Sequence, residues 1–393
     1  MSTPLIVPNE NFRLDPTRAI YVSGVINDEL ITRLTPEIIR LHHSAKTPIS
    51  VYIDSPGGLI SSMETILNLL RSPSQGTYSP CKIITAATVN AGSAAADLLS
   101  SGDYAVAYPN ATILYHGVRT FERNPLTLEY TSMLTTSPKS GNDRYAMELA
   151  RKTEDRFTFR YIFARSEFDK IRKDKNSPAL SELDCFIEII GAKLSREANK
   201  VWAKAKDRYG RYEDLLDSVM KQYGKRPGPR TLVDLEAEHL RALITLELKS
   251  NRKDPTWTFS EGGIERLVED FYLLTEYMTN YGSERLKRWC TTFGRWMVPA
   301  ETLAEIELIV DEAERVELLV ENVRPMLQPI WSFFVALCHA LQEGENRLTA
   351  TDAYWLGLVD EVIGKDLMSL RIFEEFKPDP AVGQPAAASD TDA

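Results

Sequence analysis

Short apolar runs alternate with helical periodicity along the first third of the chain. Residues 19–26 and 50–53 are nearly continuous β-branched and apolar runs, which predict buried strands. Between them, apolar residues recur at helical spacing and predict an amphipathic helix, with Leu30, Ile31, Leu34, Ile38 and Leu41 on one face. Strands that alternate with helices favour a mainly parallel, right-handed α/β sheet.

The same alternation continues to residue 117 and returns near the end of the chain. The SPGG sequence at 55–58 is predicted to break the chain before a second amphipathic helix at 59–72. A third strand is predicted at 82–89, and residues 104–117 predict two short strands around a Pro-Asn turn. Residues 346–363 read as a helix cap, a short helix, a glycine stop and an apolar strand.

Between these α/β segments the periodicity changes to 3.6 residues, with no repeat of fixed period. We therefore predict an α/β core at 1–138 and 342–376 that is interrupted by a large all-α insertion at 139–341. The insertion is expected to begin with a long helix near 143–166 and to form a packed helical subdomain rather than a cofactor site. The tail at 377–393 is rich in Pro, Ala and acidic residues and is predicted to be disordered.

Composition narrows the classes of function. The chain has 393 residues, of which 43% are hydrophobic and 26% charged, which excludes a fibrous or disordered protein. Its 46 basic and 56 acidic residues give a net charge of -10, which disfavours nucleic acid and anionic lipid as partners. The N-terminus lacks a signal-peptide pattern and the apolar stretches are too short for a membrane span, so we expect a cytoplasmic location and no membrane contact.

The cysteines point to a reducing compartment. All four lie far apart, with no CxxC spacing, which fits neither a disulfide framework nor a zinc site: Cys81, Cys185, Cys290 and Cys338. We expect four buried thiols, no metal and no cofactor.

Three features of the α/β part carry candidate chemistry. Gly57 and Gly58 lie between a strand and a helix, where the backbone can approach a ligand and present N–H groups to an oxyanion. A Pro-Gly-Gly turn is also a common structural element. Ser93 lies at the next strand-to-helix turn, where its hydroxyl would be exposed beside the N–H of Ala94. The alternative for Ser93 is a helix N-cap without chemistry.

The third feature is a histidine at the end of a strand. His116 closes the strand ATILYH, and it could act as a general base for Ser93 if the two strands are neighbours. A structural histidine is the alternative. The other histidines lie in helical patterns or at a helix end and are predicted to be structural: His42, His43, His239 and His339.

These segments together resemble the proteolytic subunit of Clp protease and its wider Clp/crotonase-type serine peptidase relatives. The resemblance rests on VYIDSPGG, the small residues before Ser93, SAAADLLSSGD, YPNATILYHG and RLTATDAYWLGLVDEV, in the family's order and spacing. It covers residues 18–118 and about 345–365. It implies a Clp/crotonase-type core of repeated ββα and βαβ units, and a self-compartmentalised homo-oligomer that cleaves peptides or unfolded proteins.

The resemblance also implies roles for single residues. Ser93 falls on the family's nucleophile, nine residues before Gly102, and His116 falls on its base. Gly58 and Ala94 fall on the two positions whose N–H groups form the oxyanion hole. Glu345 falls where the family usually has the aspartate that orients the base.

Two of these assignments leave alternatives open. For the third triad member, the neighbouring candidates are Glu343, Asn346 and Asp352. The family commonly has Ala-Ala before its serine, and a shifted alignment would put Asn90 at the nucleophile position and describe an inactive protein. We prefer Ser93, because only this register keeps the distance to Gly102.

The leading hypothesis is therefore a Clp-type serine peptidase. The alternatives are a catalytically inactive Clp-like scaffold and, less favoured, a crotonase-type acyl-CoA enzyme. The sequence has no GxxxxGK[ST] loop, so any ATP-driven unfoldase or adaptor is expected to be a separate protein. We expect the helical insertion, placed between base and carboxylate, to shield the site or to recruit substrates or a partner.

Overall fold

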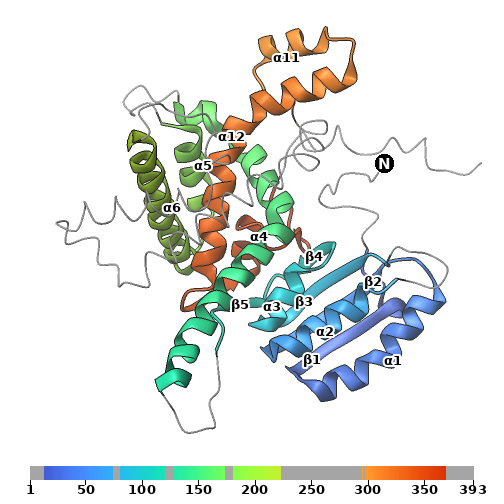
Figure 1. Cartoon of the computed structure of the whole chain (residues 1–393). Helices are drawn as coiled ribbons and strands as arrows, with labels where there is room; N and C mark the ends of the chain where they lie inside the picture. Colours follow the sequence, from blue (N-terminus) through green and yellow to red (C-terminus); the bar gives the residue numbers. More distant parts are fainter. Residues whose placement is uncertain are drawn as a thin grey trace, which may run out of the picture.

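The computed structural model describes residues 13–73, 80–119, 128–172, 180–222 and 297–368, together with residue 294. These residues form a seven-stranded sheet with helices against it and a helical layer to one side (Figure 1). The predicted tail at 377–393, His239 and Cys290 lie outside the described residues.

The N-terminal part of the sheet is built from alternating strands and helices. Its elements follow in order: η1 (Pro16–Arg18), β1 (Ala19–Ile26), α1 (Asp28–Ser44), β2 (Ile49–Gly58), α2 (Ile60–Leu70), β3 (Ile83–Gly92), α3 (Ala94–Ser100), β4 (Tyr104–Ala107) and β5 (Thr112–His116). Asn27 starts α1 because its side chain accepts a hydrogen bond from the N–H of Leu30. Leu30, Leu34, Ile38 and Leu41 are buried, as the helical spacing predicted.

The sheet is mainly parallel, which confirms the predicted α/β class. The strand order is β1-β2-β3-β4-β7, and β5 pairs with both β3 and β6. Only the pairing of β5 with β6 (Glu345–Thr349) is antiparallel among the described strands. The sequence did not predict β6, because Leu348 is the only apolar residue in it.

Two strands extend further than predicted. The expected break at 55–58 is wrong, because β2 continues through Pro56 to Gly58 and stays paired with β1 across a register shift. Proline, which has no N–H, is tolerated at such an irregularity. Strand β3 continues to Gly92 rather than ending at residue 89.

In the residues that the structure describes, the segment between β5 and β6, called the helical segment below, is helical as the periodicity predicted. It contains α4 (Leu128–Arg172), α5 (Glu182–Gly191), α6 (Arg196–Gln222), α11 (Ala300–Glu307) and α12 (Glu312–Leu341). Helix α4 includes the predicted helix at 143–166 and is longer at both ends. After β6, α13 (Ala350–Trp355) and β7 (Glu361–Val362) complete the described elements.

The helical segment and the sheet share one hydrophobic cluster. Aromatic side chains of α4, α5, α6 and α12 pack together in it, including Phe157, Phe186, Trp202, Phe333 and Phe334. Buried residues of the sheet and of α1 to α3 belong to the same cluster. The predicted limit at residue 138 lies within α4, and the limit at 341 coincides with the end of α12. The division into domains stays a prediction.

A buried arginine joins α4 to the sheet. Arg156 donates to the carboxylate of Asp360 at 2.7 Å and to the carbonyls of Ser100, Gly102 and Leu358. Ser100 and Gly102 lie at the end of α3, so α4 holds the helix that begins after Ser93.

Three cysteines lie in the described ranges, Cys81, Cys185 and Cys338, and all are buried and free. No described helix is both long and apolar enough to cross a bilayer.

Candidate active site

Ser93 occupies a strained turn between β3 and α3. Its φ and ψ are 54° and -128°, and it is the only non-glycine residue with positive φ in the described ranges. Hydrogen bonds fix the backbone on both sides: the Ser93 N–H donates to the carbonyl of Leu114 at 2.7 Å, and its carbonyl accepts from Ala96. Such a conformation costs about 1–3 kcal/mol and persists only where the surroundings impose it.

The Ser93 hydroxyl is not a helix cap. In the described part of the chain it makes no capping hydrogen bond, whereas the side chains of Asn27 and Thr349 cap α1 and α13. Ser93 is half-buried. The hydroxyl is therefore held on a sharp strand-to-helix turn, with no hydrogen-bond partner in the described ranges, which is the arrangement that a nucleophilic serine needs.

The end of β2 lies directly against this turn. A Cβ atom on Gly57, whose φ is 100°, would lie 2.7 Å from Cβ of Ser93 and 3.2 Å from the nitrogen of Ala94. A Cβ atom on Gly92 would lie 2.8 Å from the carbonyl oxygen of Pro56. Both glycines are thus required for the close approach of the two backbones.

The two predicted oxyanion residues lie on the two sides of this contact. Gly58 is the last residue of β2 and is paired with Ile26 of β1. Ala94 is the first residue of α3, where backbone N–H groups have no acceptor within the helix.

His116 lies one strand away from Ser93. Strands β3 and β5 are parallel neighbours, with Gly92 opposite Leu114, so His116 is about one strand spacing and one residue step beyond Ser93, roughly 5 Å and 3 Å. The condition set by the sequence, that the two strands be neighbours, is met. No hydrogen bond joins the Ser93 hydroxyl to the His116 ring among the described residues. Such contacts often form only when substrate binds.

The His116 ring is oriented by a main-chain carbonyl. Its Nδ1 lies 2.6 Å from the carbonyl oxygen of Gly117. Because a carbonyl only accepts, Nδ1 donates its proton there, and Nε2 keeps the lone pair that a general base uses.

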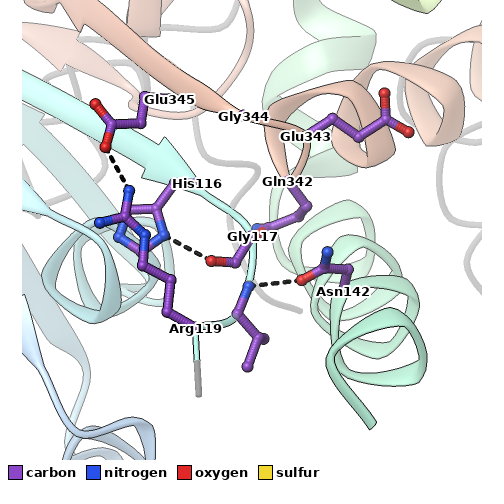
Figure 2. A pocket seen from close by; sticks show the side chains of 9 residues that line it. His116, Gly117, Arg119, Asn142, Gln342, Glu343, Gly344 and Glu345 are labelled. Atoms are coloured by element: carbon purple, nitrogen blue, oxygen red, sulfur yellow. Dashed lines mark hydrogen bonds and ion pairs between the residues drawn. The ribbon is translucent and has the colours of Figure 1, made fainter. Parts of the chain in front are cut away.

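Glu345 lies opposite His116 but is bound elsewhere. The antiparallel register of β5 and β6 pairs the two residues directly. The Glu345 carboxylate forms an ion pair with Arg119, which lowers the pKa of that carboxyl below its ordinary value (Figure 2). Both side chains are largely exposed.

His116, Arg119 and Glu345, but not Ser93, border a pocket of about 430 Å³. The pocket lies between the end of β5, helix α4 and the turn from α12 to β6 (Figure 2), and it is lined by His116, Gly117, Val118, Arg119, Asn142, Gln342, Glu343, Gly344 and Glu345. The helical segment therefore supplies one wall of the pocket beside the predicted base. No group of His, Cys, Asp and Glu side chains suited to a metal ion occurs in the described residues.

Comparison with known proteins gives a family match for the first part of the chain. The Clp protease family model matches residues 9–151. This part of the chain is Clp-protease-like. ATP-dependent Clp protease proteolytic subunit 1 of Mycobacterium bovis is 36% identical over 107 residues, which is 26% of this chain and 50% of that protein. Subunit 2 of Corynebacterium efficiens is 35% identical over 109 residues, 26% of this chain and 51% of that protein.

The match covers only part of this chain and only part of each relative. The chain spans about half the length of the curated relatives it matches. A solved structure of a ClpP1 mutant from Listeria monocytogenes is 18% identical, with a TM-score of 0.29, over 35% of this chain and 73% of that one. The Clp-protease-like part contains Gly58, Ser93, Ala94 and His116 but not Glu345.

The other candidates for the third carboxylate have structural partners. Glu343 forms an ion pair with Arg208 of α6. The Asn346 amide donates to the carbonyls of Ala340, Leu341 and Glu343 at the end of α12. Asp352 accepts from Ser195 and forms a capping box with Thr349. Their side chains join the helical segment to β6, α13 and the turn before β6.

Asn90, the alternative nucleophile position, lies within β3, three residues before the strained turn. Its side chain and N–H contact the Asp54 carboxylate. The neighbourhood of Asn90 therefore differs from the strand-to-helix turn that holds Ser93.

Sequence reasoning missed Arg119 and Asn142. Asn142 of α4 accepts a hydrogen bond from the N–H of Val118 at 2.6 Å and fixes the turn after β5. The only signal for Arg119 was its position three residues after the predicted base.

Proposed function

We propose that the Clp-protease-like part of this chain is the catalytic part of a serine peptidase. The observation that carries the proposal is the strained Ser93 turn, whose hydroxyl caps no helix and lies one strand from His116. In the proposed reaction, His116 Nε2 takes the Ser93 proton as Oγ attacks the peptide carbonyl, and then returns it to the leaving amine.

The proposed oxyanion hole is formed by the N–H groups of Gly58 and Ala94. The close packing of Gly57 against Ser93 and Ala94 supports it, because this packing brings the end of β2 to the start of α3. Preorganised backbone donors of this kind contribute roughly 3–4 kcal/mol to transition-state stabilisation in acyl transfer. Glu345 stays the predicted third member.

A fluorophosphonate probe tests the proposal. The Ser93 Oγ–P bond forms as the P–F bond breaks, fluoride leaves and the proton passes to His116. We expect labelling that is lost in Ser93→Ala and His116→Ala. The exposed Ser61 of α2 and His43 of α1 provide matched controls, and Ser61→Ala and His43→Ala should label as the native protein does. Labelling that survives in Ser93→Ala would reject Ser93 as the nucleophile.

The second candidate function is a catalytically inactive scaffold. Two observations favour it: no hydrogen bond joins Ser93 to His116 among the described residues, and Glu345 is bound to Arg119. A folded protein that shows no labelling at any pH between 6 and 9 would support the scaffold.

The assembly and the partners belong to the same proposal. We propose a homo-oligomer that encloses its sites, acts on peptides or unfolded proteins, and receives them from a separate ATP-driven unfoldase or adaptor in the cytoplasm. The helical segment is proposed to shield the site or to recruit substrates. Native mass measurement of the full chain tests the assembly. Deletion of residues 175–325 with unchanged assembly and unchanged peptide cleavage would reject the proposed role of the helical segment.

A further inference from the structure

The turn that carries Arg119 is fixed by the helical segment. The N–H of Val118 donates to Asn142 of α4, and a Cβ atom on Gly117 would lie 2.6 Å from the carbonyl oxygen of Gln342. Gly117 therefore packs tightly between α4 and the end of α12. This packing sets the direction from which Arg119 approaches the strand β6.

The Glu345 carboxylate lies within reach of both Arg119 and His116. Directly paired residues on antiparallel strands have Cβ atoms about 4.5–5.5 Å apart, so a glutamate opposite His116 is close enough to contact the ring. Among the described residues, however, no hydrogen bond joins Glu345 to His116. The carboxylate is bound by Arg119, and the ring donates to the Gly117 carbonyl (Figure 2).

On the basis of the proposed function, the geometry points to Arg119 as a positioning residue that withholds Glu345 from His116 and leaves the Gly117 carbonyl to orient the base. A guanidinium stays charged at all relevant pH values and binds a carboxylate with charge-assisted hydrogen bonds. A neutral carbonyl can fix the tautomer of the base, but it stabilises the imidazolium that forms during catalysis less than a carboxylate does. Release of Glu345 from Arg119 would therefore activate the base.

The charges around Glu345 favour its ionised form. The hydrogen bond and charge of Arg119 hold the pKa of Glu345 below its ordinary value, with smaller effects from His116 and Arg347. The charged groups that face Glu345 from the neighbouring elements are Arg119 and His116 at the end of β5, Arg347 on the same face of β6, and Glu343 in the preceding turn. The Glu343 carboxylate is paired with Arg208 of α6, and its main-chain carbonyl accepts a hydrogen bond from Lys204.

Arg347 offers a matched control. It lies on β6 opposite Leu114, is exposed like Glu345 and acts on Glu345 through its charge. Arg347→Gln therefore removes a nearby positive charge without removing the contact that holds the carboxylate.

The test is the rate of fluorophosphonate labelling of the full chain as a function of pH. We expect Arg119→Gln to label about tenfold faster or more at the plateau. We also expect the midpoint of its pH profile to move to higher pH, because an adjacent carboxylate favours the protonated imidazole. Arg347→Gln should follow the native profile. The Glu345→Gln substitution should lower the labelling rate by a factor at least ten times larger in the Arg119→Gln background than in the native protein. Equal costs in both backgrounds, or equal behaviour of the two arginine variants, would overturn the proposal.

A spectroscopic measurement separates this inference from the proposed activity. The imidazole N–H resonance of His116, identified by its loss in His116→Ala, should move to low field in Arg119→Gln and return in Arg119→Gln/Glu345→Gln. This readout does not need a reactive Ser93. If no variant is labelled, the proposed peptidase activity is rejected, but the His116 resonance still tests the role of Arg119. If the resonance does not move in Arg119→Gln, that role is rejected.

Discussion

Gly57 packs so closely against Ser93 that a Cβ atom on the glycine would lie 2.7 Å from Cβ of the serine. The two residues come from different strand ends, β2 and the turn after β3. Because the neighbouring atoms are main chain or the first side-chain atom, they cannot rotate away. The contact makes the position of Ser93 depend on the end of β2.

We predict that Gly57→Ala impairs the site more than positive φ alone would explain. The added methyl must displace either the serine turn or the end of β2, so labelling at Ser93 should fall at least tenfold, as misplaced reacting groups typically cause. Gly24→Ala is the matched control, because Gly24 has a φ of 80° and open space around it. Equal labelling rates in the two variants would show that the close approach is unimportant.

We predict that the Ser93 turn stores strain that a glycine would release. Ser93→Gly should be more stable than Ser93→Ala by about 1 kcal/mol, because glycine adopts a φ of 54° without the steric cost of a Cβ atom. Urea unfolding of the two variants measures the difference. The prediction is wrong if the alanine variant is the more stable one.

We predict that loss of Arg156, the buried arginine of α4, strongly lowers the free energy of unfolding. Arg156→Met leaves the Asp360 carboxylate buried without its cation and removes donors to the end of α3, so the free energy of unfolding should fall by about 3–5 kcal/mol. The control is Arg144→Met on the same helix, because Arg144 is exposed and the loss of its surface ion pairs with Glu148 and Glu64 should cost under about 1 kcal/mol. Similar losses in both variants would contradict the assignment of Arg156 as a buried link.

We predict a pH-dependent stability that originates at Asp97 of α3. Burial raises the pKa of this carboxyl to about 7, while Glu148 also raises it and Lys152 lowers it. Because the folded pKa is above the unfolded one, the contribution of Asp97 is complete below about pH 4 and is lost as the pH rises through 7.

The variant Asp97→Asn isolates this effect. It should be more stable than the native protein at pH 8, by on the order of 2 kcal/mol, and the difference should disappear toward pH 4. Urea unfolding at several pH values measures the trend. A constant difference from pH 4 to 8 would contradict a titrating Asp97.

The sequence predicted the elements of the sheet well where one face of each element is buried. The apolar spacing of α1 and the strand pattern of β1 and β5 follow directly from burial on the sheet, so their limits agree with the structure within a few residues. The SPGG sequence misled the prediction because parallel pairing with β1 outweighs the local turn preference of proline and glycine. Strand β6 gave no apolar alternation, since its buried positions are Asn346 and Leu348.

The candidate site was only partly predictable. The resemblance to Clp protease identified Ser93 and His116 as candidates, but their proximity depends on the pairing of β3 with β5, which no local pattern encodes. The ion pair between Arg119 and Glu345 joins residues that are far apart in the chain and depends on the register of β6. This ion pair can be predicted only after the pairing of β5 with β6 is known.

The antiparallel pairing of β5 with β6 makes the whole helical segment, topologically, the loop of a β-hairpin. Its closing residues are His116 and Glu345, which are direct partners across the two strands. The entropy of closing a loop grows only with the logarithm of its length, so the length of chain between the packed helices can change with little effect on the register of the sheet. A force that separates the two ends of the helical segment, in contrast, would first break the pairing of His116 with Glu345. The predicted base would therefore be displaced before any other residue of the sheet.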